Sequence, residues 1–350
     1  SDAVLNSLTI TGGDADRGGG IYSTGSLTIR NGTLSDNSAT GWGGGIVSYG
    51  TLSVTDSRFS NNSSGSYGGA IFGSGTLSVT NSTLSDNSAV VYGGGIYGSG
   101  TVSVLDSTLL NNKSTTGFGG GIYGSGTFSM TNSTVSGNSS KSNGGGVYHS
   151  SGKLSVANST FSNNSSGNYG GAIHSAGTLS VAGSTLSGNV ARYGGAVYQS
   201  SGMASVTNST LSNNVAERDG GALYLGSGTL AVRQSAFSGN SADSKADDGR
   251  GGAVFIVGGV VSITQSSILE NTARDDGGGI FNDSGTVSIL SSSLVANTIR
   301  GTNLWRCNGG AIYNSRGTVS VIGSSLAGNS AYDYGGGIYS EGTLAIANST

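Results

Sequence analysis

The chain has 350 residues, of which 66 are Gly and none is Pro, and only 9% are charged, with a formal net charge of −3 at pH 7. This charge argues against a nucleic-acid partner, which calls for a basic stripe on the protein surface. Abundant Gly and Ser are typical of flexible low-complexity segments, but the 34% of apolar residues fall at fixed intervals and exclude that interpretation.

No apolar run reaches the roughly 18 residues of a membrane helix, so no transmembrane segment is expected in this chain. The sequence begins at Ser1 without a signal peptide and stops at Thr350 inside a repeat, and we therefore expect it to be part of a longer chain. The single cysteine, Cys307, excludes an internal disulfide framework and leaves the redox compartment open.

One sequence unit recurs along the whole chain. Each unit carries a GG[GA] element followed by an apolar anchor residue, and most units are 25 or 26 residues long. Thirteen units of this length indicate a solenoid. The anchors are Ile21, Ile46, Ile71, Ile96, Ile122, Val147, Ile173, Val197, Leu223, Val254, Ile280, Ile312 and Ile338.

Each unit contains three short extended segments. The first is GGGIY, the second alternates between polar and apolar residues as in Thr51–Thr55, and the third has the form LSDN. Alternation with a period of two predicts strands, and no segment has the 3.6-residue period of a helix. A leucine-rich repeat is the alternative of similar length, but it needs an L-x-x-L-x-L strand and usually a helix.

We therefore predict an all-β fold, a single right-handed parallel β-helix that runs continuously over residues 1–350. It would have about 13 coils of 25–26 residues with three strands each, stacked at about 4.8 Å. Ile96, Val102, Val104 and Leu109 are the expected core residues of one coil, and loop insertions are expected near residues 242–250 and 299–308.

Asparagine ends the third segment in twelve units. An amide both donates and accepts hydrogen bonds, so stacked Asn side chains can bond each other and the turn backbone. We favour this structural ladder over a role as sugar or ion ligands. The ladder residues are Asn37, Asn62, Asn87, Asn112, Asn138, Asn164, Asn189, Asn214, Asn240, Asn271, Asn297 and Asn329.

The combination of GG[GA][ILV] and [LF]-x-x-N resembles the paired repeats of the polymorphic outer-membrane protein family. It is equally similar to bacterial right-handed β-helix surface proteins with GGGIY and LSxN repeats. The resemblance covers essentially the whole chain, and it specifies fold more strongly than function because core, turn and glycine positions carry it. It implies a secreted or surface-exposed region used in adhesion or envelope structure.

Two columns of aromatic residues follow from the repeat, and the residue after each inward-pointing anchor is expected to point outward. They either form a ladder that stiffens the solenoid or also contact sugars, another protein or a second copy of the chain. The first aromatic column, the residue after each anchor, contains Tyr22, Phe72, Tyr97, Tyr123, Tyr148, Tyr198, Tyr224, Phe255, Phe281, Tyr313 and Tyr339, with Val47 and His174 at the remaining positions. The second aromatic column, just before the glycines, contains Trp42, Tyr67, Tyr92, Phe118, Tyr169 and Tyr193, and turns polar at Asp219 and Asp276 before Tyr334.

Charged residues concentrate in one turn of the later units. Clustered carboxylates serve calcium binding or acid–base chemistry in pectin-cleaving β-helix enzymes. Here the signs are mixed and the residues lie in loops of differing length, so we favour a cluster of self-paired charges. The carboxylates concerned are Asp219, Asp247, Asp248, Asp275 and Asp276.

Other candidate residues give weaker signals. His149 and His174 have no evident nucleophile or carboxylate partner at an equivalent position. Trp305 and Cys307 lie in the least repetitive segment and are candidates for a partner contact or an intermolecular disulfide, with a decorated loop as the alternative.

The sequence therefore predicts an extracellular or cell-surface β-helix with a structural or adhesive role. We expect no catalytic residue, no metal site and no cofactor. Expected partners are other copies of the chain, end to end or side by side, or surface glycans. The alternative is a carbohydrate-binding or polysaccharide-degrading protein, either a polysaccharide lyase or a glycoside hydrolase.

Overall fold

The structure is a computed structural model that describes residues 2–243, 248–301 and 307–350. These residues form an all-β parallel solenoid of about 13 coils with three sheets, which confirms the predicted fold class. None of them lies in a helix of the length and hydrophobicity that a membrane crossing requires. The coils divide into two compact units, residues 1–167 with 172–177 and residues 168–171 with 178–350. Continuity of a single β-helix over both units stays a prediction.

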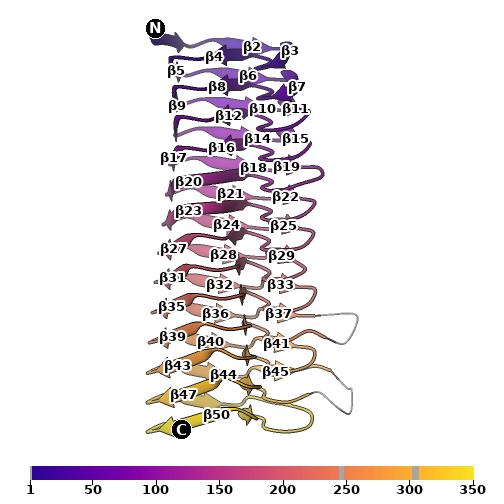
Figure 1. Cartoon of the computed structure of the whole chain (residues 1–350), viewed down its shortest axis with the longest axis vertical. Coiled ribbons are helices and arrows are strands. Elements are labelled where there is room, and N and C mark those ends of the chain that lie inside the picture. The colour runs from indigo at the N-terminus through magenta and orange to yellow at the C-terminus, as the bar shows by residue number, and fades with distance from the viewer. Residues whose placement is uncertain (1, 244–247, 302–306) are drawn as a thin grey trace. The chain divides into compact units, whose positions relative to one another are not determined.

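The first unit contributes strands to all three sheets (Figure 1). Its sheet A strands are β1 (Asp2–Asn6), β4 (Ile21–Ser23), β5 (Ser26–Arg30), β8 (Ile46–Ser48), β9 (Thr51–Thr55), β12 (Ile71–Gly73), β13 (Thr76–Thr80), β16 (Ile96–Gly98), β17 (Thr101–Leu105), β20 (Ile122–Thr131), β23 (Val147–Ala157) and β26 (Ile173–Ser175). Its sheet B strands are β2 (Thr9–Thr11), β6 (Thr33–Ser35), β10 (Arg58–Ser60), β14 (Thr83–Ser85), β18 (Thr108–Leu110), β21 (Thr134–Ser136) and β24 (Thr160–Ser162). Its sheet C strands are β3 (Asp14–Arg17), β7 (Ser38–Trp42), β11 (Ser63–Ser64), β15 (Ser88–Ala89), β19 (Lys113–Ser114), β22 (Ser139–Ser140) and β25 (Ser165–Ser166).

The second unit repeats the arrangement. Its sheet A strands are β27 (Thr178–Ala182), β30 (Val197–Gln199), β31 (Met203–Thr207), β34 (Leu223–Leu225), β35 (Thr229–Arg233), β38 (Val254–Ile256), β39 (Val260–Thr264), β42 (Ile280–Asn282), β43 (Thr286–Leu290), β46 (Ile312–Asn314), β47 (Thr318–Ile322), β49 (Ile338–Ser340) and β50 (Thr343–Ala347). Its sheet B strands are β28 (Thr185–Ser187), β32 (Thr210–Ser212), β36 (Ala236–Ser238), β40 (Ser267–Leu269), β44 (Ser293–Val295) and β48 (Ser325–Ala327). Its sheet C strands are β29 (Val190–Ala191), β33 (Val215–Ala216), β37 (Ser241–Ala242), β41 (Thr272–Ala273) and β45 (Thr298–Ile299).

The three predicted segments of a coil map onto two of the sheets. The GGGIY segment and the alternating segment both lie in sheet A, and in β20 and β23 they join into one strand. The LSDN segment forms sheet B. Sheet C consists mostly of two-residue strands that follow the ladder Asn, such as Ser88–Ala89, and it adds to what the sequence predicts. The expected insertions contain residues 244–247 and 302–306, which lie outside the described residues.

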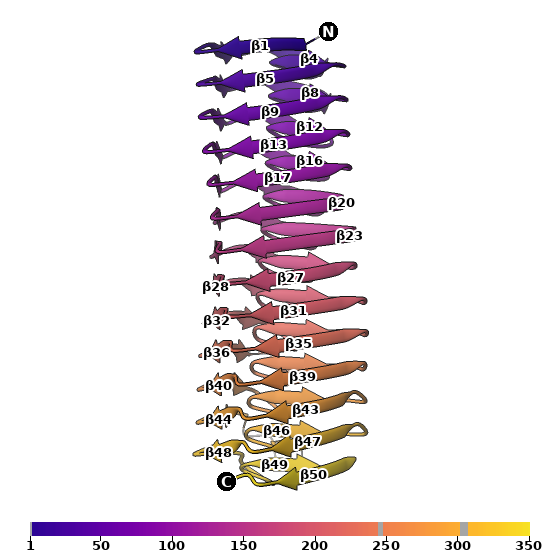
Figure 2. The same ribbon diagram turned by 90° about the vertical axis from the view of Figure 1, so that its left-hand side faces the viewer.

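In-register stacking places the apolar side chains of successive coils on one another. Leu77 of β13 pairs with Val102 of β17, and Val79 pairs with Val104, in parallel register. Each of these four side chains is at most 1% exposed. Burial of one such side chain contributes about 1.5–3 kcal/mol, so the repeated apolar positions of β5, β9, β13 and β17 stabilise the first unit coil by coil (Figure 2).

The corner before each anchor requires glycine at two positions. Gly93 has a φ of +66°, and a Cβ there would lie 2.2 Å from the Ile96 carbonyl oxygen. A Cβ on Gly94 would lie 2.4 Å from the carbonyl oxygen of Gly120 in the next coil. Both distances are too short for any real contact, so the close approach of successive corners explains the recurring GG element.

The turn between the alternating segment and sheet B uses the left-handed backbone conformation. Asn81 has a φ of +47° and Asp106 a φ of +49°, and Asn and Asp adopt this region more readily than other non-glycine residues. Asn and Asp alternate at this position over five coils of the first unit, from Asn31 to Asn132. The Asn81 amide donates to the Asp56 carboxylate at 2.5 Å, and the Asn132 amide donates to that of Asp106 at 3.1 Å.

Candidate functional site

The first aromatic column forms a continuous ring stack in the first unit. The centroids of neighbouring rings among Phe72, Tyr97, Tyr123 and Tyr148 lie 4.9, 5.1 and 5.2 Å apart, with interplanar angles of 16° or less. His174 continues the stack at 4.6 Å from Tyr148. The rings stack because parallel strands in register hold equivalent side chains on neighbouring coils about 4.8 Å apart.

The second aromatic column covers the first. Each of its rings in the first unit stacks on the first-column ring of the following coil. The ring centroids lie 4.6 to 5.2 Å apart in four pairs: Trp42–Phe72, Tyr67–Tyr97, Tyr92–Tyr123 and Phe118–Tyr148. Because the faces of the inner rings contact other rings, this part of the molecule presents ring edges and hydroxyl groups rather than open ring faces.

Several residues of the first column are buried, although the sequence analysis expected them to face outward. Phe72 is 6% exposed, and Phe255 and Phe281 are 4% exposed, whereas Tyr22 is 53% exposed. The side chain before the glycines lies over this column, as Trp42 does over Phe72 and Arg250 over Phe255, and so the residue after an inward anchor is not left in solvent. Burial, together with the neighbouring tyrosines, raises the pKa of Tyr97.

In the second unit the second aromatic column becomes polar over four coils. After Tyr193, the residue before the glycines is Asp219, then Arg250, Asp276 and Asn308. Backbone hydrogen bonds confirm that these four are equivalent, because the glycine after each one donates to the carbonyl of the next: Gly220 to Arg250, Gly251 to Asp276 and Gly277 to Asn308. Asp219 and Asp276 are the two polar members of this column that the sequence predicts, and Arg250 and Asn308 are additional members that the structure reveals. The GG that follows each of them is the signal that locates them.

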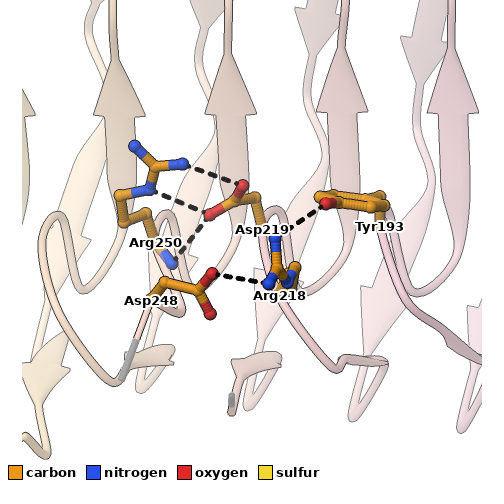
Figure 3. A network of polar contacts seen from close by, with 5 residues as sticks. All are labelled: Tyr193, Arg218, Asp219, Asp248 and Arg250. Carbon is orange, nitrogen blue, oxygen red and sulfur yellow. Dashed lines mark hydrogen bonds and ion pairs between the residues drawn. The ribbon is translucent and has the colours of Figure 1, made fainter. Parts of the chain in front are cut away.

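Arg250 and Asp219 form the centre of a polar network (Figure 3). The Arg250 guanidinium donates to both Asp219 oxygens, from Nε to Oδ1 at 3.0 Å and from Nη2 to Oδ2 at 3.1 Å, and the Arg250 backbone N–H also donates to Oδ1. Arg218 pairs with Asp248 at 3.1 Å and donates to the Tyr193 hydroxyl at 3.2 Å. The guanidinium of Arg250 also lies 4.9 Å from the Phe255 ring centroid and 5.0 Å from that of Phe281.

Burial and ion pairing shift the pKa of each member of this pair in opposite directions. Asp219 is only 4% exposed, and its burial raises its pKa while the Arg250 guanidinium opposes the rise. Burial alone would lower the pKa of Arg250, but the neighbouring carboxylates of Asp219, Asp248 and Asp276, with Asp219 contributing most, together offset it and raise that pKa. The Arg250 guanidinium therefore favours the ionised form of the buried Asp219 carboxylate.

A groove lies over the first aromatic column of the second unit where the second column is polar, from Asp219 to Asn308. Asp and Asn side chains are shorter than Tyr or Trp, so they leave space beside the neighbouring rings. Two cavities result, one of about 500 Å³ over Tyr198, Tyr224 and Phe255, and one of about 390 Å³ over Phe281, Tyr313 and Tyr339. Arg250 and Asp283 line both cavities, and we call the two together the second-unit groove.

The opposite wall of this groove is also charged. Arg316 binds both oxygens of Asp283, at 2.7 and 2.8 Å. The hydroxyl groups of Tyr313 and Tyr339 both donate to Glu341 Oε1, at 3.3 and 3.2 Å. The groove therefore has an aromatic floor between two walls of paired charges.

Two family models match segments of this chain. Residues 1–161 match the model of the right-handed β-helix region. The chain is similar to right-handed β-helix proteins. Residues 158–176 and 208–226 match the Chlamydia polymorphic membrane protein repeat, and each of these segments contains an FSNN or LSNN turn followed by a GGA corner. No curated protein and no solved structure matches the chain.

The asparagine residues form a hydrogen-bonded ladder inside each unit. In the first unit the Asn62 side-chain amide donates to Asn87 Oδ1, and that of Asn87 donates to Asn112 Oδ1, both at 2.9 Å. In the second unit Asn240 donates to Asn271 in the same way at 2.9 Å. Each ladder Asn from Asn37 to Asn297 is fully buried, so these side chains are not presented to a ligand.

A second ladder of serines was missed by the sequence analysis. The Ser57 backbone N–H donates to Ser82 Oγ at 3.0 Å, and the Ser82 hydroxyl donates to the Thr80 carbonyl at 2.7 Å. The same pattern continues at Ser107, and in the second unit at Ser209 and Ser235. The serine that follows Asn or Asp in the recurring NST and DST triplets is the signal that identifies this ladder.

Three of the remaining candidates, Cys307, His149 and His174, lie away from the surface. Cys307 is fully buried and packs with Ala242, Ala273 and Ile299, so the contact expected at this residue is not available on the outside of the unit. Trp305 lies outside the described residues. Burial lowers the pKa of His149, which is fully buried and packs edge-on against Phe128, and burial lowers that of His174 to about 4.

The candidate acidic residues do not converge on one centre. Asp219 and Asp248 pair with different arginines, Asp276 accepts from the Asn308 backbone N–H at 3.0 Å, and Asp275 is 1% exposed. Asp247 lies outside the described residues. Over residues 2–243, 248–301 and 307–350, no three His, Cys, Asp or Glu side chains are placed to hold a metal ion together.

Proposed function

We propose that this chain is a non-catalytic β-helix of a bacterial cell surface with a structural or adhesive role. Its repeats at residues 158–176 and 208–226 are similar to those of a membrane protein family, which supports a surface or outer-membrane location. The observation that carries the proposal is that recurring side chains contact their own equivalents on the next coil. The polar side chains do so through hydrogen bonds and the aromatic side chains through ring stacking. Asn87 binds Asn112, and Tyr97 stacks on Tyr123.

The pairing of the acidic side chains supports a non-catalytic role. A general acid or base must exchange a proton with the substrate through an accessible oxygen. Both Asp219 oxygens accept hydrogen bonds from Arg250, and the side chain is 6% exposed. The test is incubation of the chain with neutral and acidic polysaccharides followed by measurement of new chain ends. Depolymerisation that disappears in Asp219→Asn would contradict the proposal.

The surface location is tested on intact cells of the bacterium that produces the protein. We expect antibodies against the folded chain to label the cells without permeabilisation, and externally added protease to remove the label. Labelling only after permeabilisation would overturn the location.

A further inference from the structure

The second-unit groove is the part of the aromatic columns where cavities lie beside half-buried tyrosine rings of the first column, such as Tyr224 and Tyr313. In the first unit Tyr67 covers Tyr97, and Tyr92 covers Tyr123. In the second unit the equivalent positions over the column hold Asp219, Arg250 and Asp276. The cavities of about 500 and 390 Å³ that result are within the range of roughly 300–1,000 Å³ that is typical of ligand sites.

The groups around this groove present donors and acceptors side by side. The guanidinium of Arg250 is fixed by Asp219 on one side and by the Phe255 and Phe281 rings beneath it. Arg316 and Asp283 provide a second donor and acceptor pair on the opposite wall. Tyr hydroxyl groups, which both donate and accept, lie between the walls.

The pairing of the charged side chains around the groove indicates which class of ligand fits it. Arg218, Arg250 and Arg316 are each already paired with a carboxylate. An anion would have to compete with those carboxylates, and a cation with the arginines. A hydroxyl group can accept from a guanidinium and donate to a carboxylate without displacing either. The apolar C–H groups of a sugar ring can at the same time contact the aromatic floor.

We propose that the second-unit groove binds a neutral oligosaccharide non-covalently. This proposal rests on the proposed adhesive function and names the partner of the surface that carries it. In the first unit second-column rings occupy the space over Tyr97 and Tyr123. In the second unit Tyr169 and Tyr193 likewise contact Tyr198 and Tyr224, and the polar residues begin only at Asp219.

The experiment uses the full chain on an array of neutral oligosaccharides built from hexoses and N-acetylhexosamines, with sialylated and uronate-containing glycans as the anionic set. Calorimetry then measures affinity for the neutral glycans that bind. The Asp219→Tyr, Arg250→Tyr double variant fills the groove with the residue type of the rest of the column and removes both members of the ion pair. The Asp283→Asn, Arg316→Gln double variant changes the exposed wall, where the Arg316 side chain is 72% exposed. Leu110→Ser, on the surface of the first unit, is the matched control.

We expect the parent and Leu110→Ser to bind neutral glycans equally, and both groove variants to lose at least tenfold in affinity while keeping the parent's circular dichroism spectrum. Should the tyrosine variant fail to fold, the exposed-wall variant decides. The proposal is overturned if the parent binds no neutral glycan, if it binds anionic glycans only, or if the folded groove variants bind like the parent. Surface labelling of intact cells without glycan binding would overturn this inference alone and leave the proposed location standing.

Discussion

Arg250 and Asp219 form a bidentate ion pair at the position where the second aromatic column of the second unit changes from rings to charges. The two hydrogen bonds measure 3.0 and 3.1 Å, and the same guanidinium lies about 5 Å above two phenylalanine rings. Arg250 therefore neutralises a buried carboxylate and also covers rings that a tyrosine covers elsewhere. A charged side chain can take this place only because its partner sits in the preceding coil.

Replacement of Arg250 by Met should destabilise the second unit by about 3–5 kcal/mol at pH 7, because it leaves the Asp219 carboxylate buried without its cation. Burial already raises the pKa of Asp219, and loss of the guanidinium would raise that pKa further. A raised carboxyl pKa costs stability as the pH rises through it, so the loss should shrink at acid pH. Urea denaturation at pH 7 and pH 4 measures the difference, and hydrogen exchange at β34 and β38 localises it. An equal loss at both pH values would contradict the account.

The Asp219→Tyr, Arg250→Tyr double variant is the control for this prediction. Replacement of a buried ion pair by well-packed apolar groups is often neutral or stabilising. We therefore expect the double variant to be at least as stable as the parent in the same urea experiment.

A carboxylate introduced into the Asn ladder should destabilise the first unit. Asn87 donates to the Phe59 carbonyl and to Asn112 Oδ1, and its own Oδ1 accepts from Asn62. Asn87→Asp keeps the shape but cannot donate while it is ionised, so it faces two acceptors in a buried site. Each unsatisfied buried group costs about 1–3 kcal/mol, and we expect a loss of at least 3 kcal/mol at pH 7 with partial recovery at acid pH. Thermal unfolding by circular dichroism measures it, with Leu110→Ser as the surface control.

The ladders and the core could be predicted from the sequence because they depend on recurrence alone. Leu52 and Val54 alternate with polar residues, and an amide such as Asn87 returns once in every coil. In-register stacking then brings each residue against its own equivalent. The serine at position 82 returns just as regularly, so its ladder was open to the same reasoning.

The groove could not be predicted, because it depends on contacts between unlike residues. Asp219 and Arg250 are 31 positions apart, and an insertion of changed length lies between them. The burial of Phe255 depends on the Arg250 side chain that lies over its ring, which no periodicity reveals. Sheet C strands such as Ser88–Ala89 are two residues long and too short to show alternation.

The alternation of Asn and Asp in the left-handed turns should prevent repulsion between stacked carboxylates. Asn81 stands between Asp56 and Asp106 in successive coils of the first unit, and its amide donates to Asp56. Asn81→Asp would place three carboxylates in a row, at a cost of about 0.5–1 kcal/mol that added salt screens. The melting temperature at low and high ionic strength measures this cost. Asn208→Asp is the matched control, since its φ of +49° is similar and its neighbour Gln234 is uncharged.

The two buried histidines should set the acid sensitivity of the first unit. Burial lowers the pKa of His149 and lowers that of His174 to about 4. A histidine with a lowered pKa binds fewer protons in the folded protein than in the unfolded chain, so stability falls as the pH drops from about 6.5 towards 4. For His174 the full effect is on the order of 3 kcal/mol. His174→Tyr restores the residue type of Tyr148, on which it stacks, and His149→Ser introduces the residue of the aligned position 175. His149→Ser removes part of a buried ring and costs some stability at every pH, so the comparison is the change with pH: we expect the melting temperature of the double variant to fall clearly less than that of the parent between pH 7 and pH 4.5. Parallel melting curves for the two proteins across this pH range would show that other groups control the acid response.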